Sequence, residues 1–358
     1  MPISITQLDS LTAKAISLLE ALIAIPAYSK EEDERASLLV DYFNSLGIEC
    51  FRIANNVILG SNPQTSKPII LLNSHIDTVR PSSTWQRSAH IPTSEGDRIY
   101  GLGTNDAGAS LVCLIMTYLH LHTTDQPYHL VLAASAEEEI SGQNGIVQVI
   151  NHLAKVDLAI VGEPTGMQMA IAEKGLMVVD AIAEGISGHA AREEGKNAIY
   201  QALEDITWIR QYSFDKISPY LGLTKATVTM IQSGTQHNVI PDQCTYVIDV
   251  RSNELYSNKE ILDLLQSGVQ SILKARSFRL NSSTIDAHHP IVIKGTFLGL
   301  SAYGSPTLSD QALMPYTSIK IGPGDSARSH TADEFITREE IRLGIKTYID
   351  LLDGLILN

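Results

Sequence analysis

The chain has 358 residues, of which 44% are hydrophobic and 18% are charged, and its formal net charge at pH 7 is −14. This size and composition predict a soluble protein of two domains with a sizeable core. The acidic balance argues against a nucleic-acid partner, because no basic stripe is present to neutralise phosphates, and no window approaches the roughly 18 apolar residues that a membrane-spanning helix needs.

The first predicted element is an amphipathic helix within residues 1–30, where apolar residues recur at helical spacing. This segment lacks the basic start and the continuous apolar stretch of a signal peptide. The three cysteines, Cys50, Cys113 and Cys244, are distant from one another and odd in number, which is not the pattern of a disulfide framework. Both observations predict a cytoplasmic protein.

Strand and helix patterns then alternate up to about Glu173. The predicted helices cover residues 31–46, 108–120 and 143–153, and the predicted strands cover residues 50–53, 57–60, 68–77, 128–135 and 157–162. Near-continuous apolar strands separated by helices indicate a mostly parallel sheet with helices on both faces. The first part of the chain is therefore predicted to be a doubly wound α/β domain.

The pattern changes after Lys174. The next predicted elements are a strand at 176–185, a helix at 197–212, strands at 224–232 and 244–251, a helix at 259–274 and a strand at 278–286. This β-α-β-β-α-β order predicts a small α+β sandwich of the ferredoxin-like kind. Its strands alternate between apolar and polar residues, as expected when one face stays solvated.

The first pattern resumes after about Asp286. The predicted elements are a helix near 307–314, a strand at 317–321 and a closing helix at 338–356. A site that combines His330, in this last part, with residues of the first part requires the two outer segments to form one domain. We therefore predict a discontinuous metal-binding domain of residues 1–173 and 286–358, with residues 174–285 as an inserted domain.

Side chains that commonly bind metal ions follow or adjoin the predicted strands. They are His75, Asp106, the pair Glu138–Glu139, Glu163 and, in the last part of the chain, His330. Ligands of open α/β sheets bind outside the carboxyl ends of the strands, so residues far apart in sequence converge there. Three carboxylates and two imidazoles are donors that a two-zinc site takes. The sequence therefore predicts a metal-dependent hydrolase.

Each of these residues also has a purely structural interpretation. His75 could be a strand-end histidine hydrogen-bonded in the core, or a metal ligand whose other ring hydrogen goes to Asp77. Asp106, in a glycine-rich turn that enters a helix, could be an ordinary N-cap or could bridge two cations. A phosphate-binding loop at Gly103–Ser110 is disfavoured, because Ala109 stands where the lysine of that motif belongs.

An acidic triplet, Glu137–Glu139, follows the strand at 128–135 with no neighbouring lysine or arginine. A solvated run of charge is the usual explanation for such a triplet. Three carboxylates just past a buried strand repel one another unless a cation is near, and two adjacent glutamates suit a division of labour in which one binds metal and the other takes a proton from water. The motifs of competing catalytic classes, G-x-S-x-G, H-E-x-x-H, C-x-x-C and G-x-G-x-x-G, are absent from the sequence.

Eight short stretches carry a resemblance to a known family. In chain order they are SHIDTV, YGLGTNDAGAS, SAEEEISG, VGEPT, SGHAA, HNVIPD, IDVR and GPGDSARSHTADEF. They resemble the di-zinc aminoacylase/exopeptidase family, which includes acetylornithine deacetylase, succinyl-diaminopimelate desuccinylase, aminoacylase and the glutamate-releasing carboxypeptidases. The resemblance covers nearly the whole chain. It implies a zinc-peptidase-like α/β domain, interrupted by a smaller sandwich that usually mediates dimerisation, and hence a homodimer.

The resemblance also implies a metal-binding role for each candidate ligand. His75 and Glu163 would hold one zinc ion. Glu139 and His330 would hold the other, and Asp106 would bridge the two. Cobalt is an alternative to zinc. Such a pair of ions polarises the scissile carbonyl group and lowers the pKa of a bridging water.

The same resemblance assigns the groups that act on the substrate. Glu138 is implied as the general base, and Asp77 as the carboxylate behind His75. His189 resembles a lid histidine that donates to the oxyanion, often from the partner subunit. The implied substrate contacts are Asn238 and Arg251 in the lid, and Gly322 and Gly324 in a loop near the substrate carboxylate.

Three positions depart from the family pattern. Arg80 stands where proline commonly follows the HxDTV segment, and Ala107–Gly108 stands where the family often has Met-Lys. The family's Asp-Glu-Glu-Gly becomes Glu-Glu-Glu-Ile at residues 137–140. This last departure leaves Glu137 and Glu138 as an alternative base–ligand pair.

The GEPT, GPG and SHTADEF stretches look most like acetylornithine deacetylase and its relatives. The resemblance therefore implies hydrolysis of an N-acyl amino acid (acyl-ornithine, acyl-citrulline or acyl-lysine) in arginine biosynthesis. Desuccinylation of succinyl-diaminopimelate, or dipeptide cleavage, is the alternative enzymatic function. A non-catalytic protein that binds metal or a small molecule on the same fold is a remoter alternative, which Glu138 disfavours because a pure binder has no need of a base.

Overall fold

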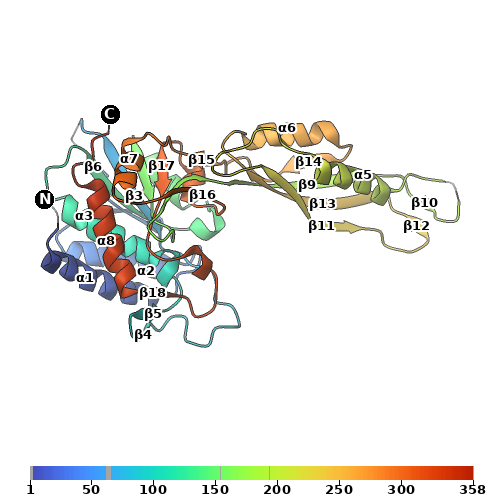
Figure 1. Ribbon diagram of the computed structural model, residues 1–358. Coiled ribbons are helices and arrows are strands. Elements are labelled where there is room, and N and C mark those ends of the chain that lie inside the picture. The colour runs from blue at the N-terminus through green and yellow to red at the C-terminus, as the bar shows by residue number, and fades with distance from the viewer. Residues whose placement is uncertain (1–2, 62–65, 154, 193, 358) are drawn as a thin grey trace. The chain divides into compact units, whose positions relative to one another are not determined.

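The computed structural model describes residues 3–61, 66–153, 155–192 and 194–357 (Figure 1). They form two compact units. The first unit comprises the chain up to Ile171, Ile285–Tyr303 and the residues from Ser309 on. The second unit comprises Ala172–Thr284 and Gly304–Leu308. Every residue predicted to bind metal belongs to the first unit.

A mixed sheet forms the scaffold of the first unit, and its last strand, β15, belongs to the residues of the second unit. The described strands follow the order β1-β2-β6-β3-β7-β17-β8-β15, with β16 beside β8. Their bounds are β1 (Cys50–Ile53), β2 (Asn56–Leu59), β3 (Ile69–His75), β6 (His129–Ser135), β7 (Leu158–Val161), β8 (Met169–Glu173), β15 (Ser283–Thr284), β16 (Ala302–Ser305) and β17 (Ser318–Lys320). The central strands β6, β3, β7 and β17 are parallel, whereas β1, β2, β8 and β15 pair antiparallel. Parallel strand ends therefore meet at the middle of the sheet.

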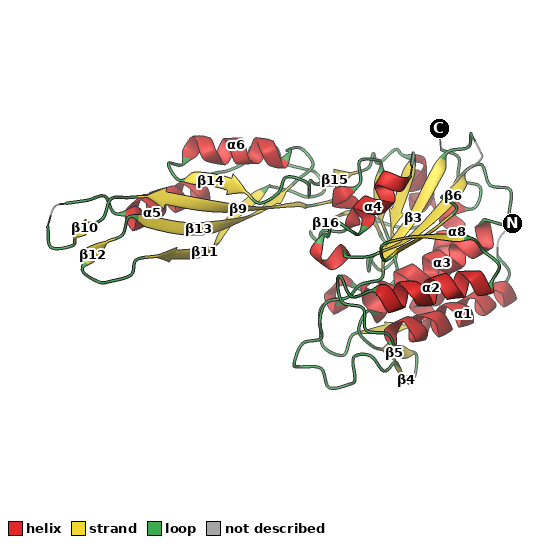
Figure 2. Ribbon diagram, turned by 180° about the vertical axis from the view of Figure 1, so that it is seen from behind, coloured by secondary structure: helices red, strands yellow, loops and turns green. Residues whose placement is uncertain are grey.

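Helices cover both faces of this sheet (Figure 2). They are α1 (Ile5–Ile23), α2 (Asp33–Ser45), α3 (Ala109–Leu121), α4 (Ile146–His152), α7 (Pro290–Phe297) and α8 (Arg338–Leu352). In β3, Ile70 and Leu72 join the core shared with α1, α2, α3 and α8, whereas Leu71 joins a separate core under α4. Because both faces are buried, the first four residues of β3, Ile69–Leu72, are all apolar instead of alternating with polar residues. None of the described helices combines the length and the apolar character that crossing a membrane requires.

A small sheet joins two distant segments of the first unit. Its strands are β4 (Thr93–Glu95), β5 (Arg98–Tyr100) and β18 (Phe335–Thr337). β18 pairs antiparallel with β5, and the N–H of Gly101 donates to the carbonyl oxygen of Glu334 (3.0 Å). This pairing brings the turn after β5, which carries Asp106, next to the segment before β18, which carries His330.

The second unit is an antiparallel sheet with helices on one face. Its described strands follow the order β11-β13-β9-β14, and a short pair, β10 and β12, lies outside this sheet. The elements are β9 (Gly175–Glu184), β10 (Gly188–His189), α5 (Ala198–Gln211), β11 (Lys225–Ser233), β12 (Val239–Ile240), β13 (Gln243–Ser252), α6 (Asn258–Gly268) and β14 (Ile272–Ala275). Alternate residues of β9 and β13 are buried in the core that α5 and α6 share. The predicted fold class, a mostly parallel α/β sheet with an inserted α+β sandwich, is confirmed.

The boundaries of the last helix and strand of the insertion are wrong in the prediction. The helix predicted at 259–274 stops at the end of α6, because the carboxylate of Asp205 accepts hydrogen bonds from the N–H groups of Gln270 (3.0 Å) and Ser271 (2.8 Å). These bonds turn the chain, and the next residues form β14 beside β9. The closing strand of the sandwich therefore comes earlier than 278–286, and within that range β15 is the only described strand.

The helix predicted near 307–314 is also wrong. Only Asp310–Leu313 forms a short 3-10 turn. Pro315 disfavours helical backbone at the preceding residue, and Met314 is accordingly extended (φ −85°, ψ 127°). The hydroxyl of Ser135, at the end of β6, donates to the carboxylate of Asp310 (2.8 Å), which fixes the turn against the sheet.

Candidate metal centre

Three neighbouring parallel strands end at one edge of the sheet, and a candidate ligand lies at or just beyond each end. His75 is the last residue of β3, and β6 and β7 lie on either side of it. Glu138 and Glu139 follow β6 after a short turn, and Glu163 follows β7. The carboxyl ends of these strands therefore gather the side chains at one place.

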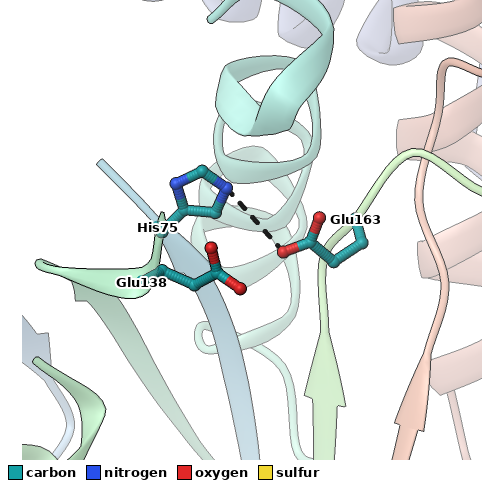
Figure 3. Close-up of side chains that lie close together, drawn as sticks. All are labelled: His75, Glu138 and Glu163. Carbon is teal, nitrogen blue, oxygen red and sulfur yellow. Dashed lines mark ion pairs between the residues drawn. The ribbon is translucent and has the colours of Figure 1, made fainter. Parts of the chain in front are cut away.

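The structure brings the candidate ligands together in two groups of three. The groups are His75, Glu138 and Glu163, and Asp106, Glu139 and His330. Within each group the donor atoms all lie within 4.8 Å of one another. Figure 3 shows the first group, in which the side chains point into one space and Nε2 of His75 lies 3.8 Å from Oε1 of Glu163.

The carboxylate of Asp106 lies between the two imidazoles. Its Oδ1 is 3.3 Å from Nε2 of His75, and its Oδ2 is 3.6 Å from Nε2 of His330. Nε2 of His330 is in turn 3.0 Å from Oε2 of Glu139. A carboxylate with one oxygen toward each imidazole has the arrangement that a ligand shared by two metal ions requires.

The backbone fixes the orientation of the His75 ring. Its Nδ1 lies 2.9 Å from the carbonyl oxygen of Asp77. A carbonyl oxygen can only accept, so in the neutral ring Nδ1 carries the hydrogen and Nε2 presents its lone pair toward Asp106 and Glu163. That is the tautomer of a metal-binding histidine. The carboxylate of Asp77, the partner predicted for Nδ1, lies farther away, with Oδ1 3.5 Å from it.

The Asp77 carboxylate holds the loop after β6 instead. It accepts hydrogen bonds from the hydroxyl of Ser29 (2.7 Å) and from the N–H groups of Glu138 (3.0 Å) and Glu139 (3.2 Å). Burial opposes its charge, but hydrogen bonding with His75 and these donors outweighs burial and holds the pKa of Asp77 below its ordinary value. Asp77 is thus a buried anion that links the end of β3 to both glutamates.

Glu137 points away from the cluster. Its carboxylate accepts hydrogen bonds from the N–H (3.2 Å) and the side-chain amide (2.9 Å) of Asn144. The chain turns at Glu137, where φ is 53°, directly before Glu138. Among the described residues Glu137 belongs to neither ligand group. The geometry favours the pair Glu138–Glu139 over the alternative pair Glu137–Glu138.

The carboxylates of the cluster repel one another in a buried place. Burial, reinforced by the charge of Asp106, raises the pKa of Glu163 to about 8. Burial and the neighbouring carboxylates raise the pKa of Glu138 well above its ordinary value. The hydrogen bond with Glu139 raises the pKa of His330 to about 9. All three shifts favour the protonated form, through burial for the two glutamates and through the neighbouring carboxylates for His330.

The donor set fits divalent metal ions. Imidazole nitrogen and carboxylate oxygen are both donors that zinc takes, and cations would replace the protons that the shifted groups otherwise hold. Oε1 of Glu163 supports the fit, because it is buried and has no hydrogen-bond partner among the described residues. An unpartnered buried oxygen is costly unless a positive group satisfies it. The residues that could hold metal ions are the six of the two groups, His75, Glu138 and Glu163, and Asp106, Glu139 and His330.

Gly322 and Gly324 lie in the turn after β17. A Cβ atom on Gly322 would lie 2.5 Å from the backbone oxygen of Glu163, and one on Gly324 would lie 2.3 Å from Oδ1 of Asn105. The N–H of Met167 donates to the carbonyl oxygen of Gly322 (2.8 Å). The two glycines thus let the turn pack closely against Glu163 and Asn105, and their contact with substrate stays a prediction.

His189, Asn238 and Arg251 belong to the second unit. β10, which contains His189, pairs with β12, which directly follows Asn238. Nδ1 of His189 accepts a hydrogen bond from the N–H of Ala191 (3.1 Å), which leaves the ring hydrogen on Nε2. Arg251 lies near the end of β13, with its Nε 2.8 Å from Oδ1 of Asp249.

Three buried charged residues around the cluster are not among the predicted site residues. Asp310 is bound to the end of β6, and burial raises its pKa to about 7. Arg35 donates to the carbonyl oxygen of Ile76 (2.6 Å), and burial lowers its pKa to about 10. Glu334 accepts a hydrogen bond from the N–H of Asp106 (2.9 Å). Only Glu334 has a sequence signal, because it lies in the SHTADEF stretch; the other two are isolated charges without a pattern.

Comparison with known proteins identifies the family. The sequence profile of peptidase family M20/M25/M40 matches residues 71–354. The chain belongs to this family. It is 27% identical over 355 residues to a succinyl-diaminopimelate desuccinylase of Corynebacterium glutamicum, covering 91% of this chain and 92% of that protein. It is 28% identical over 356 residues to a LysW-lysine/LysW-ornithine hydrolase of Sulfurisphaera tokodaii, covering 96% of each.

Solved structures share the fold of this M20 chain. Aminopeptidase PepT of Bacillus cereus superposes with a TM-score of 0.77 at 18% identity, covering 95% of this chain and 98% of that one. A Bacillus subtilis protein described as a dinuclear metal-binding peptidase of the M20 family superposes with a TM-score of 0.73 at 15% identity, covering 96% and 98%. The predicted family and the predicted class of amide-cleaving metallohydrolase are confirmed.

Proposed function

We propose that this M20 family member hydrolyses the amide bond of an N-acyl amino acid in the manner of an acetylornithine deacetylase. The proposed substrates are acyl-ornithine, acyl-citrulline or acyl-lysine, and the proposed pathway is arginine biosynthesis. One observation carries the proposal: the carboxylate of Asp106 lies between the imidazoles of His75 (3.3 Å) and His330 (3.6 Å), within two groups of metal-binding donors. The names of two relatives support the substrate class, because they contain diaminopimelate, lysine and ornithine.

The proposed site holds two metal ions. His75 and Glu163 would hold one ion, and Glu139 and His330 the other. Asp106 would bind both. Zinc is the proposed metal and cobalt the alternative, since imidazole and carboxylate donors suit either. When bound, the ions supply the Lewis acidity that polarises the scissile carbonyl and lowers the pKa of a water molecule. Three ligand carboxylates against two divalent ions leave one net positive charge, which suits an anionic transition state.

Glu138 is proposed as the general base. Its carboxylate lies in one group with His75 and Glu163, and its N–H donates to Asp77 (3.0 Å). A raised pKa suits a carboxyl group that takes a proton from water and later delivers it to the leaving amine. Asp77 would act as a positioning residue, because it holds Glu138 through the backbone and stands next to the ring of His75.

Further residues are proposed to act on the substrate. His189 would donate its Nε2–H to the oxyanion, and the hydrogen bond that its Nδ1 accepts supports this tautomer. The remaining proposed contacts are Asn238 and Arg251 in the insertion, and Gly322 and Gly324 near the substrate carboxylate.

We propose residues 1–173 and 286–358 as the catalytic domain and residues 174–285 as an inserted lid and dimerisation domain. The protein would then be a cytoplasmic homodimer. The edge strand β11 supports dimerisation, because Met230 and Ile231 are exposed apolar residues on an edge where another strand can pair. Light scattering in solution measures the oligomeric state, and a monomer would contradict this part of the proposal.

A steady-state panel of N-acyl amino acids tests the proposed reaction. Acetyl and succinyl forms of ornithine, citrulline and lysine are compared on zinc-loaded and cobalt-loaded protein, with succinyl-diaminopimelate and dipeptides as competitors. We expect the highest kcat/KM for an acyl-ornithine or acyl-citrulline. The Corynebacterium glutamicum relative favours desuccinylation as the second candidate, and a preference for succinyl-diaminopimelate would establish it. Absence of turnover with every acyl-ornithine and acyl-citrulline would contradict the narrower proposal.

A further inference from the structure

We propose that Glu334 is a positioning residue for the second ligand group, whose carboxylate fastens the turn that carries Asp106 to the segment that carries His330. This inference rests on the proposed function, because it presumes a site for two metal ions. Glu334 would touch neither substrate nor metal and would act through Asp106 and His330.

Glu334 is 2% exposed, and its carboxylate accepts hydrogen bonds from three N–H groups of one turn. Oε1 accepts from Asn105 (2.7 Å) and Asp106 (2.9 Å), and Oε2 accepts from Gly103 (3.2 Å). The backbone bond from Gly101 to the carbonyl oxygen of Glu334 (3.0 Å) extends the same contact. This one side chain satisfies three buried N–H groups that would otherwise lack an acceptor, so its loss should loosen the turn.

The turn needs an acceptor from elsewhere because its backbone is irregular. The φ and ψ angles of Asp106 (−118°, 97°) lie outside the helical region, and Gly103 has a φ of 81°. The N–H groups of Gly103, Asn105 and Asp106 precede α3 and lie outside its hydrogen-bonded turns, so another part of the fold must supply their acceptor. The Glu334 side chain is the acceptor for these N–H groups. It thereby fixes the direction in which the Asp106 side chain leaves the backbone.

A second link joins the same turn to the chain before His330. Oδ1 of Asn105 accepts from the N–H of Asp325 (2.9 Å), and Nδ2 of Asn105 donates to the carbonyl oxygen of Asp325 (3.1 Å) and to Oγ of Ser329 (3.4 Å). Asn105 and Glu334 thus attach the chain on either side of His330. His330 has a φ of 58°, a left-handed conformation that residues other than glycine keep only when their surroundings hold it.

The first ligand group is held by a different part of the fold. His75 ends β3 and Glu163 follows β7, and the two strands are hydrogen-bonded neighbours in the large sheet. Asp106 is shared by both proposed ions, but the ion held with His75 and Glu163 keeps two ligands fixed by the sheet. Loss of the Glu334 carboxylate should therefore weaken the binding of the ion held with Glu139 and His330 more than the binding of the other ion. A general loss of folding would weaken both equally. This selectivity separates a positioning role from a merely structural one.

Titration of the metal-free protein with Co²⁺, followed by the visible absorption of the bound ion, tests the inference. Glu334→Gln keeps the size of the side chain but turns an NH₂ group toward N–H donors. We expect the affinity for one ion to fall by about 10–100-fold, the range for residues that orient metal ligands, and the affinity for the other ion to fall by less, because only the shared ligand Asp106 is disturbed there. Asp205→Asn is the matched control, because Asp205 is also buried and accepts N–H bonds, from Gln270 and Ser271, within the second unit. It should leave both affinities unchanged.

Two unchanged cobalt affinities in Glu334→Gln would overturn the inference, and so would an equal loss of both. If Glu334→Gln does not fold, Glu334→Asp decides, because it keeps the carboxyl group but shortens the side chain and so withdraws it from the three N–H groups. An unequal loss of the two affinities in Glu334→Asp supports the inference, and no loss overturns it. The readout needs no substrate. Selective loss in a protein that hydrolyses no N-acyl amino acid would refute the proposed function and leave this inference standing.

Discussion

The two ligand groups are built in different ways. In the first, His75 ends β3 and Glu163 follows β7, so the ladder of parallel strands sets their positions, and the His75 side chain is only 1% exposed. In the second, the His330 side chain is 55% exposed on a loop, and Asp106 lies in an irregular turn. Hydrogen bonds between loops hold the second group. We therefore expect substitutions in the first group to act mainly on stability and those in the second mainly on metal affinity.

Replacement of Glu138 by alanine should have the largest effect of the proposed substitutions, and the quantity affected should be the turnover rate. Loss of a general base lowers turnover by about 10²–10⁴-fold, and the proposed metal ligands remain, so the protein should keep both ions. Kinetics and metal analysis of the same sample measure the two quantities. Glu137→Gln is the matched control, because Glu137 is adjacent but bonded to Asn144, and its turnover should match that of the unsubstituted protein. Unchanged turnover in Glu138→Ala would rule out Glu138 as the base.

The metal-free protein should lose stability as the pH rises, because the buried carboxyl group of Glu163 must then give up its proton. In the metal-free protein burial raises the pKa of Glu163 from its ordinary 4.5 to about 8. The folded state then holds this proton more tightly than the unfolded state does. The resulting stabilisation is fully present below the unfolded pKa of 4.5 and is lost as the pH rises through the folded pKa of about 8. The hydrogen bond with Glu139 raises the pKa of His330 from 6.5 to about 9, which acts in the same direction over a higher range.

The urea midpoint of chelator-treated protein should therefore fall between about pH 5 and pH 9. Zinc-loaded protein should show a smaller fall, because the ions replace the protons. Since Glu163 is buried and His330 is exposed, most of the fall should come below about pH 8. A midpoint of the metal-free protein that rises over this range would contradict the expected sign.

His75→Ala and His330→Ala compare the two groups directly. Removal of the buried His75 ring takes a hydrogen-bond partner from the carbonyl oxygen of Asp77 and from Oδ1 of Asp106, at a cost of about 1–3 kcal/mol to the stability of the metal-free protein. His330 is exposed, so its removal should cost no more than about 0.5 kcal/mol. Both variants should bind metal more weakly. Urea unfolding with chelator present measures the difference, and equal losses would mean that the sheet does not hold the first group more firmly than the loops hold the second.

The positions of the first group are predictable from sequence because their signal is local. Residues 69–72 form a continuous apolar run, and the strand predicted at 68–77 contains all of β3. The strands predicted at 128–135 and 157–162 likewise contain β6 and β7. Once such strands are parallel neighbours, the residues at their ends must gather. The pattern does not say which end residue plays which role; the family resemblance assigns those roles.

The second group cannot be predicted from pattern, because short and distant contacts form it. β4, β5 and β18 have three residues each, too few for a hydrophobic period to indicate a strand. The hydrogen bond between Gly103 and Glu334 joins residues that are 231 positions apart. Asp310 is a single acidic residue, and although Glu334 lies in the SHTADEF stretch, nothing local in the sequence indicates that either residue is buried. The approach of Asp106 to His330 is therefore a property of the tertiary fold.

Gly324→Ala, compared with Gly299→Ala, should have the smallest effect on metal affinity, and it tests whether packing at Gly324 holds the second ligand group. The two glycines have positive φ (90° and 87°), so alanine should cost a similar amount at each, about 1 kcal/mol, through backbone strain. No described atom lies within 4 Å of a Cβ on Gly299, whereas a Cβ on Gly324 would lie 2.3 Å from Oδ1 of Asn105. Because Asn105 holds the chain before His330, only Gly324→Ala should also weaken one cobalt affinity. If both variants lose the same stability and bind both ions normally, packing at Gly324 does not hold the second group.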